Sequence, residues 1–191
     1  DEIAAVSHHY GAEVPLRRPI ELAGDAVTDL PVFQHALAWL AEYQGYQPDI
    51  VIHLHATSPV RPTDCLDNAI RLLLKNPDAD CVRSVVTPSQ SPYKMWHIDE
   101  LSNHMFPLLS VEGIAEPYNT PRQKLPPAYL QTGHVNGIRT GTIQRGSMTG
   151  RVIMPLVIDP QYEIDLDTEE DWQYGEWVVA NRKLDMVWPE K

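Results

Sequence analysis

The sequence predicts a single α/β domain, residues 1–191, built on a Rossmann-like, mainly parallel sheet with flanking helices. Two observations indicate this class. In the first half of the chain, segments with helical spacing of apolar residues alternate with short β-branched runs, which is typical of parallel sheets. Seventeen prolines, about twice the average usage, concentrate between residues 88 and 160. Loops are therefore expected to dominate the second half.

The first elements are two helices. Residues 1–10 are expected to form a helix that ends at Gly11. Pro31 is expected to open a second helix, because proline suits a first helical position and apolar residues then recur at three and four positions. This helix is expected to end near Gly45.

A strand, a helix and a second strand follow. The run DIVIHLH, residues 49–55, is short and β-branched, as in an interior strand. Thr63 is expected to cap a helix that stops before Pro77, since a residue preceding proline disfavours the helical conformation. Residues 81–86 then predict the next strand.

Residues 87–150 are predicted to leave the sheet, because about 60 residues without helical period exceed an ordinary connector. We expect β-hairpins that form a lid or a subunit contact. Residues 151–158 return as a strand, and Thr168 caps the last helix, whose first turn carries carboxylates favoured by the helix dipole.

Charge and composition argue against several classes of function. The formal net charge is −11 with no basic block, which disfavours nucleic-acid binding. Apolar stretches are too short to span a bilayer, and no signal pattern opens the sequence. Cys65 and Cys81 lack metal or redox spacing, so they are expected to be buried apolar residues, which suits a reducing cytoplasm.

Two acids just before the last helix form the first candidate site. Successive side chains of an extended segment alternate, so Asp165 and Asp167 are expected to share one face and to reach one cation. Mg²⁺ usually takes one or two protein carboxylates together with substrate phosphate oxygens and water. The alternative is that these acids only serve the dipole of the following helix.

The loop after the first strand is the second candidate site, because ligands bind at the carboxyl ends of strands in open α/β sheets. Thr57 and Ser58 can donate hydrogen bonds to a ligand, and Arg61 can pair with an anion. The alternative is an ordinary turn. His53 and His55 could form a metal pair, although hydrogen-bonded strand histidines are the commoner case.

Five segments, taken in order, resemble the CMP-sugar synthetases of the acylneuraminate cytidylyltransferase family. The resemblance covers nearly the whole chain. The five segments are RPIELAGD, LHATSPVR, SPYKMW, PRQKLPPAY and IDLDTEED.

The resemblance implies transfer of CMP from CTP to a nonulosonic, sialic-type acid, with Mg²⁺ and release of pyrophosphate. It places the metal at Asp165 and Asp167. It also implies a homodimer formed through residues 87–150. The residues that fall on its substrate-binding motifs are Arg18, Asp25, His55, Thr57, Ser58, Arg61, Arg122 and Gln123.

The chain departs from the family pattern at three points. His55 and Ala56 replace glutamine and proline, and Thr132 precedes Gly133 where the family has asparagine. The family's first strand and its glycine- and serine-containing phosphate loop have no counterpart, so a partial chain is expected, and whether it is active alone is open. Two alternatives are a non-catalytic homologue that binds nucleotide or sugar, and a glycosyltransferase with an Asp-x-Asp metal site.

Overall fold

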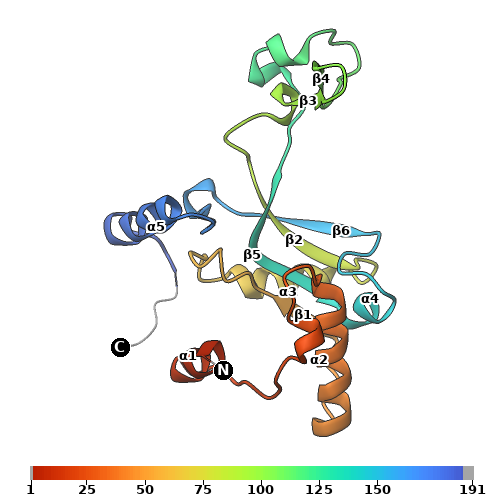
Figure 1. The fold of residues 1–191 in the computed structure, drawn as a ribbon, viewed down its shortest axis with the longest axis vertical. Coiled ribbons are helices and arrows are strands. Elements are labelled where there is room, and N and C mark those ends of the chain that lie inside the picture. Colours follow the sequence, from red (N-terminus) through yellow and green to blue (C-terminus); the bar gives the residue numbers. More distant parts are fainter. Residues whose placement is uncertain (1, 187–191) are drawn as a thin grey trace.

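Four strands form the central sheet in the computed structural model, which describes residues 2–186 (Figure 1). Their spatial order is β1-β5-β2-β6. The strands are β1 (Ile50–His53), β2 (Cys81–Val86), β5 (Leu130–Arg139) and β6 (Ile153–Val157). β3 (Trp96–Asp99) and β4 (His104–Pro107) pair with each other in a separate hairpin.

The helices are α1 (Glu2–His9), α2 (Asp29–Gln44), α3 (Cys65–Lys75), α4 (Thr140–Gln144) and α5 (Glu169–Asn181). α2 ends as predicted, with Gly45 in the left-handed conformation at φ 61°. α5 begins with a capping box in which Thr168 and Asp171 exchange side-chain to backbone hydrogen bonds. Thr63 does not cap α3, because its hydroxyl donates instead to Asp185 at 2.7 Å.

The predicted α/β class is confirmed, with helices on both faces of the sheet (Figure 1). β1, β2 and β6 run in one direction, and β2 pairs with β6 in parallel. β5 lies between β1 and β2 and is antiparallel to both. The sheet is therefore mixed around this one reversed strand.

The excursion from the sheet is shorter than the sequence predicted. β5 and α4 both lie within residues 87–150, so only residues 87–129 leave the sheet. β5 lacks strand alternation because residues 133–138 are all buried. A Cβ on Gly137 would lie 3.2 Å from Leu73 of α3, so close helix packing favours glycine there.

Two apolar clusters fill the two faces of the sheet. α3 packs on one face through the fully buried Ala69 and Leu73, which belong to the same apolar cluster as Val82 and Val135. On the other face, α2 and α4 pack around a smaller cluster of Cys81, Ile138 and Ile143. Both cysteines are free and buried, as predicted.

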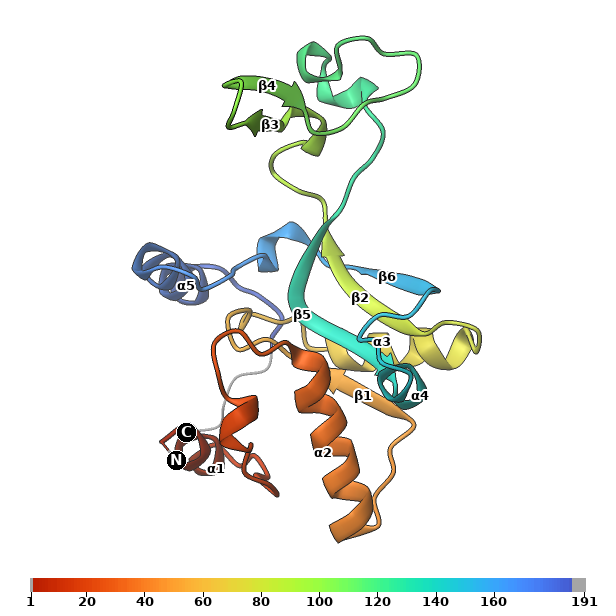
Figure 2. The ribbon, with the colours of Figure 1, turned by 45° about the vertical axis from the view of Figure 1, so that its right-hand side comes forward.

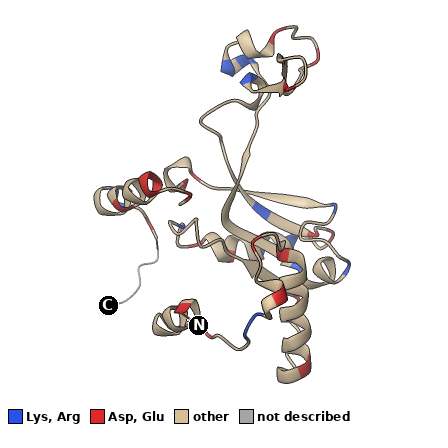
Figure 3. Ribbon diagram, in the orientation of Figure 1, with Lys and Arg blue, Asp and Glu red and all other residues tan. Residues whose placement is uncertain are grey.

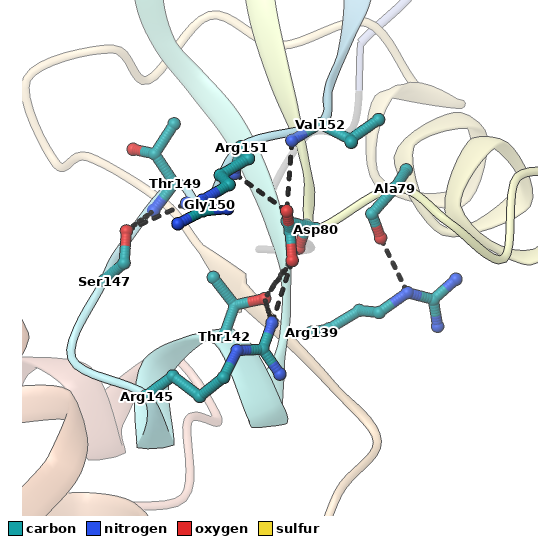
Figure 4. Close-up of polar contacts among 10 residues, drawn as sticks. All are labelled: Ala79, Asp80, Arg139, Thr142, Arg145, Ser147, Thr149, Gly150, Arg151 and Val152. Carbon is teal, nitrogen blue, oxygen red and sulfur yellow. Dashed lines mark hydrogen bonds and ion pairs between the residues drawn. The ribbon is translucent and has the colours of Figure 1, made fainter.

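Asp80, just before β2, is hydrogen-bonded to the segment before β6 and to the region of α4 (Figure 4). Its carboxylate accepts hydrogen bonds from the amides of Arg151 at 2.8 Å and Val152 at 3.0 Å. The hydroxyl of Thr142 donates at 3.2 Å and the guanidinium of Arg145 at 2.9 Å. The Val152 and Arg151 amides are the main reason that the pKa of Asp80 is lowered to about 2.

The excursion stands away from the sheet, joined to it by the segments that follow β2 and precede β5 (Figure 2). It holds the β3–β4 hairpin and three short 3₁₀ turns, η2 (Pro92–Lys94), η3 (Pro117–Asn119) and η4 (Arg122–Lys124). Throughout residues 2–186, no helix is both long and apolar enough to cross a bilayer.

Candidate active site

The loop that follows β1, residues 55–61, is held against the start of β5. The amide of His55 donates to the carbonyl of Gly133 at 3.2 Å. Within the loop, the amide of Ser58 donates to the carbonyl of His55 at 3.3 Å. Ser58 and Val60 are only 2% and 3% exposed, so the loop is anchored by buried residues rather than free in solvent.

The Arg61 side chain forms a second connection between this loop and β5. Its Nε donates to the carbonyl of His134 at 2.8 Å, and its Nη2 donates to the carbonyl of His55. Burial lowers the pKa of the Arg61 guanidinium. Two of the five N–H donors of the guanidinium group thus bond to backbone carbonyls and connect the loop to β5. We call these two hydrogen bonds the Arg61 brace.

The segment that carries the two acids lies directly beside this loop. The amide of Leu166, the residue between them, donates to the carbonyl of Thr57 at 2.8 Å. Ser58 Oγ lies 3.5 Å from Oδ1 of Asp165. Leu166 packs against the core, whereas Asp165 and Asp167 are both exposed. Asp165 therefore lies next to the Ser58 turn, and binding of one cation by Asp165 and Asp167 together stays a prediction.

The carboxylates of Asp165 and Asp167 are suited to a hard cation. Within residues 2–186, no Lys, Arg or His forms an ion pair with either of them. The same residues contain no cluster of three or more His, Cys, Asp or Glu side chains that could hold a metal by themselves. Two carboxylates with the remaining positions left to substrate oxygens and water match the usual ligands of Mg²⁺.

His53 and His55 do not have the arrangement of a metal pair. Their rings stack at 4.5 Å between centroids with 25° between planes. Ring-nitrogen lone pairs lie in the ring plane, so stacked imidazoles cannot aim two of them at one ion. His53 also packs against Phe33 of α2, and burial, together with the neighbouring His55, lowers the pKa of His53. The stacked rings therefore argue against a metal pair, and His55 lies after the end of β1 rather than within the strand.

His134 is a residue of this region that the sequence did not single out. It is 1% exposed, and its Nε2 lies 2.9 Å from the carbonyl of Tyr162. Since a carbonyl only accepts hydrogen bonds, Nε2 carries a proton. Burial is the main cause that lowers the pKa of His134. The contact ties β5 to η5 (Pro160–Tyr162), just before the acids.

Four predicted site residues lie elsewhere. Arg18 and Asp25 are exposed on either side of η1 (Ile20–Leu22), with no hydrogen bond or ion pair to the loop among the described residues. Arg122 and Gln123 are on η4 of the excursion. There Arg122 donates to the carbonyls of Ser89 at 3.1 Å and Pro88 at 2.5 Å. Lys and Arg residues gather on this part of the excursion (Figure 3).

Comparison with known proteins supports the resemblance read from the motifs. No model of a known protein family matches the chain. The chain is 25% identical over 185 residues to the post-translational flagellin modification protein B of Campylobacter coli. It is 27% identical over 185 residues to the CMP-N,N'-diacetyllegionaminic acid synthase of Campylobacter jejuni. Each match covers 96% of this chain and 75% of the relative. The predicted resemblance to CMP-nonulosonic acid synthetases is therefore confirmed over nearly the whole chain.

Proposed function

We propose that this chain catalyses the transfer of CMP from CTP to a nonulosonic acid, with Mg²⁺ bound at Asp165 and Asp167. The observation that carries the proposal is the junction between the acids and the loop after β1. The amide of Leu166 donates a hydrogen bond to the carbonyl of Thr57 at 2.8 Å, and Oδ1 of Asp165 lies 3.5 Å from Oγ of Ser58. The Ser58 hydroxyl and the Asp165 carboxylate thus lie side by side after β1, near the carboxyl end of a strand, where ligands bind in open α/β sheets. Among residues 2–186, no Lys, Arg or His forms an ion pair with Asp165 or Asp167.

The reaction requires positioning more than covalent catalysis. The anomeric hydroxyl of the sugar forms a bond to the α-phosphorus of CTP, the bond from that phosphorus to pyrophosphate breaks, and the hydroxyl proton leaves to solvent. Mg²⁺ held by the two acids would neutralise charge on the phosphoryl oxygens. Thr57 and Ser58 would supply hydroxyl groups beside the metal, and the hydrogen bonds from Arg61 to the carbonyls of His55 and His134 would hold the loop that carries them.

The substrate class follows from the resemblance. The Campylobacter jejuni relative is named for a CMP-linked diacetyllegionaminic acid, which is a nonulosonic acid. We extend the class of acceptor, rather than that particular sugar, to this chain. A cytoplasmic location is part of the proposal and is supported by two free, buried cysteines, which suit a reducing compartment.

Homodimerisation through the excursion is a further part of the proposal. Trp96 and Ile98 share one face of the β3–β4 hairpin with Met105, and these side chains are 38%, 57% and 54% exposed. An isolated two-stranded hairpin is marginally stable in water, so an apolar face of this kind favours a partner. Arg122 and Gln123 lie on the same excursion. A role for them at the sugar site would require one protomer's excursion to meet its partner's sheet.

The proposal is tested by pyrophosphate release from CTP against a panel of nonulosonic acids, with Mg²⁺ or with chelator. We expect Mg²⁺-dependent turnover, which Asp165→Ala or Asp167→Ala abolishes. Both carboxylates are exposed, so the melting temperature should change little. Asp78→Ala, an exposed acid before β2, is the control and should keep full turnover.

The outcomes separate the alternatives. Undiminished turnover in the two variants would remove both acids from the mechanism. Binding of CTP or acid sugar without any turnover by the wild-type chain would favour a non-catalytic homologue. Turnover only with a nucleotide sugar and a second acceptor would favour a glycosyltransferase.

A further inference from the structure

The pairing of β2 with β5 is interrupted beside the candidate site. Arg83 is paired with Asn136, but Val85 is paired with Gln131. An advance of two residues along β2 therefore corresponds to an advance of five residues along β5. The extra residues of β5, 132–135, form a bulge without regular ladder pairing. A bulge re-aims side chains and leaves backbone groups without ladder partners.

The hydroxyl of Ser84 supplies those missing partners. Ser84 Oγ donates to the carbonyl of Thr132 at 3.0 Å. It accepts from the amide of Val135 at 3.1 Å and from the hydroxyl of Thr132 at 3.0 Å. Ser84 is 0% exposed, and one donated and two accepted bonds use the full capacity of a hydroxyl.

The bulge presents Gly133 and His134 to the candidate site. The carbonyl of Gly133 accepts from the amide of His55, and the carbonyl of His134 accepts from Arg61. The ring of His134 donates to the carbonyl of Tyr162, which precedes the two acids. Both halves of the site, the loop and the acidic segment, are thus attached to the bulge.

We propose that Ser84 is a positioning residue, which acts through the bulge in β5 to set the loop 55–61 relative to Asp165. Its role in catalysis rests on the proposed function, whereas its role in geometry does not. Without the hydroxyl, the amide of the fully buried Val135 and the carbonyl of the half-buried Thr132 lose this hydrogen-bond partner, which is costly. The bulge would then shift, and Gly133 and His134 would move with it.

The test compares Ser84→Ala with Val82→Ala. Val82 is also in β2 and 0% exposed, but it is paired with Gly137, outside the bulge. Both substitutions are expected to lower the melting temperature, so stability alone does not distinguish them. Hydrogen exchange at the amides of His55 and Leu166 distinguishes the two variants, because these amides donate hydrogen bonds to the carbonyls of Gly133 and Thr57, which join the parts of the site.

In Ser84→Ala these two amides are expected to exchange about tenfold faster relative to the amides of α3, as in a local opening. In Val82→Ala the exchange rates of these two amides are expected to change by the same factor as the exchange rates of the α3 amides. Equal behaviour of the two variants, or no selective change in Ser84→Ala, would overturn the proposal.

Turnover supplies the catalytic part of the test. With CTP, acid sugar and Mg²⁺, at a temperature where both variants are folded, kcat of Ser84→Ala is expected to fall about tenfold or more, since small displacements of positioned groups cost that much. The Mg²⁺ concentration for half-maximal rate should rise in the same variant. Val82→Ala should stay within about twofold of the wild type. A wild-type chain that releases no pyrophosphate would count against the proposed function only, and the exchange rates would still decide on Ser84.

A milder variant keeps the test decisive if Ser84→Ala does not fold. Thr132→Val removes the hydroxyl that donates to Ser84 but preserves side-chain shape. It is expected to accelerate exchange at His55 and Leu166 in the same direction by a smaller factor. Exchange rates there equal to the wild type would refute the assignment.

Discussion

Gly133 lies so close to Ser58 that a Cβ built on it would be 2.4 Å from the Ser58 hydroxyl oxygen. The same Cβ would be 2.7 Å from the Cβ of His55. Real Cβ atoms do not approach other atoms this closely, so either the loop or β5 has to move when a side chain is added. The glycine is therefore required by the junction between the loop and the bulge.

Gly133→Ala is accordingly expected to destabilise the protein by about 1–3 kcal/mol, the usual cost of overpacking a buried position. The measurement is urea unfolding of the wild type and the variant. We also expect turnover to fall, because the loop that carries Ser58 is displaced.

Gly141→Ala is the matched control for this prediction. A Cβ there would meet Arg145 Nη1 at 3.2 Å, which is the far end of an exposed, flexible side chain. Alanine also favours the helical conformation of α4, so stability should be unchanged or slightly higher. Equal losses in the two variants would contradict the steric explanation.

The elements that the sequence predicted best are those whose pattern is local. Residues 81–86 form β2 with the predicted bounds, and Thr168 caps α5 through its side chain. β5 escaped prediction because its shape depends on distant residues. Gly137 makes room for Leu73 of α3, and the bulge is held by Ser84, so neither strand period nor β-branching marks the segment.

The candidate site was predictable only in part for the same reason. The sequence singled out Ser58 and Asp165 because each lies next to a recognisable element, and the structure shows that they are neighbours, whereas their roles stay predictions. The sequence indicated Arg61 as an anion partner, which stays a prediction, but it did not reveal that Arg61 donates to the carbonyls of His55 and His134. Every residue has a backbone carbonyl, so the residue types in a sequence do not indicate which carbonyls accept hydrogen bonds from a side chain.

Arg61→Lys tests the brace between the loop and β5. Lysine has one ammonium group and cannot present the planar fork that reaches two carbonyls. We expect stability to fall by about 1–3 kcal/mol, the range for hydrogen bonds from charged groups to a buried acceptor. Chemical unfolding of the purified variant gives this value directly.

Arg71→Lys serves as the comparison for that measurement. Arg71 pairs with Asp67 at 3.2 Å on the exposed side of α3. Exposed pairs contribute little, so this change should cost less than about 0.5 kcal/mol. If both arginines tolerate lysine equally well, the brace does not stabilise the loop.

Asp80 is expected to make stability depend on pH in the acid range. Its pKa is lowered from 3.8 to about 2 in the folded state, so the folded protein favours the carboxylate. The stabilisation it gives is complete above the unfolded pKa of 3.8 and is lost as the pH falls through about 2. The wild type should therefore exceed Asp80→Asn in free energy of unfolding by a constant amount above about pH 5, and by a smaller amount at lower pH.

Thermal unfolding of the two proteins between about pH 2 and pH 6 measures that difference. Asp78→Asn, an exposed acid two residues away, should show no comparable dependence. A gap between wild type and Asp80→Asn that stays the same down to the lowest pH would show that ionisation of Asp80 is not the cause.

The hairpin of the excursion yields the last prediction, which concerns assembly. Ile98 and Met105 are directly paired and exposed on one face, whereas His97 and His104 lie on the opposite face. Ile98→Lys would place a charge in the proposed interface and is expected to raise the dimer dissociation constant at least about tenfold, because an unpaired buried charge is costly. His104→Ser changes the other face and should leave the constant unaltered. Light scattering across a concentration series measures both, and a wild-type chain that stays monomeric at high concentration would rule out the interface altogether.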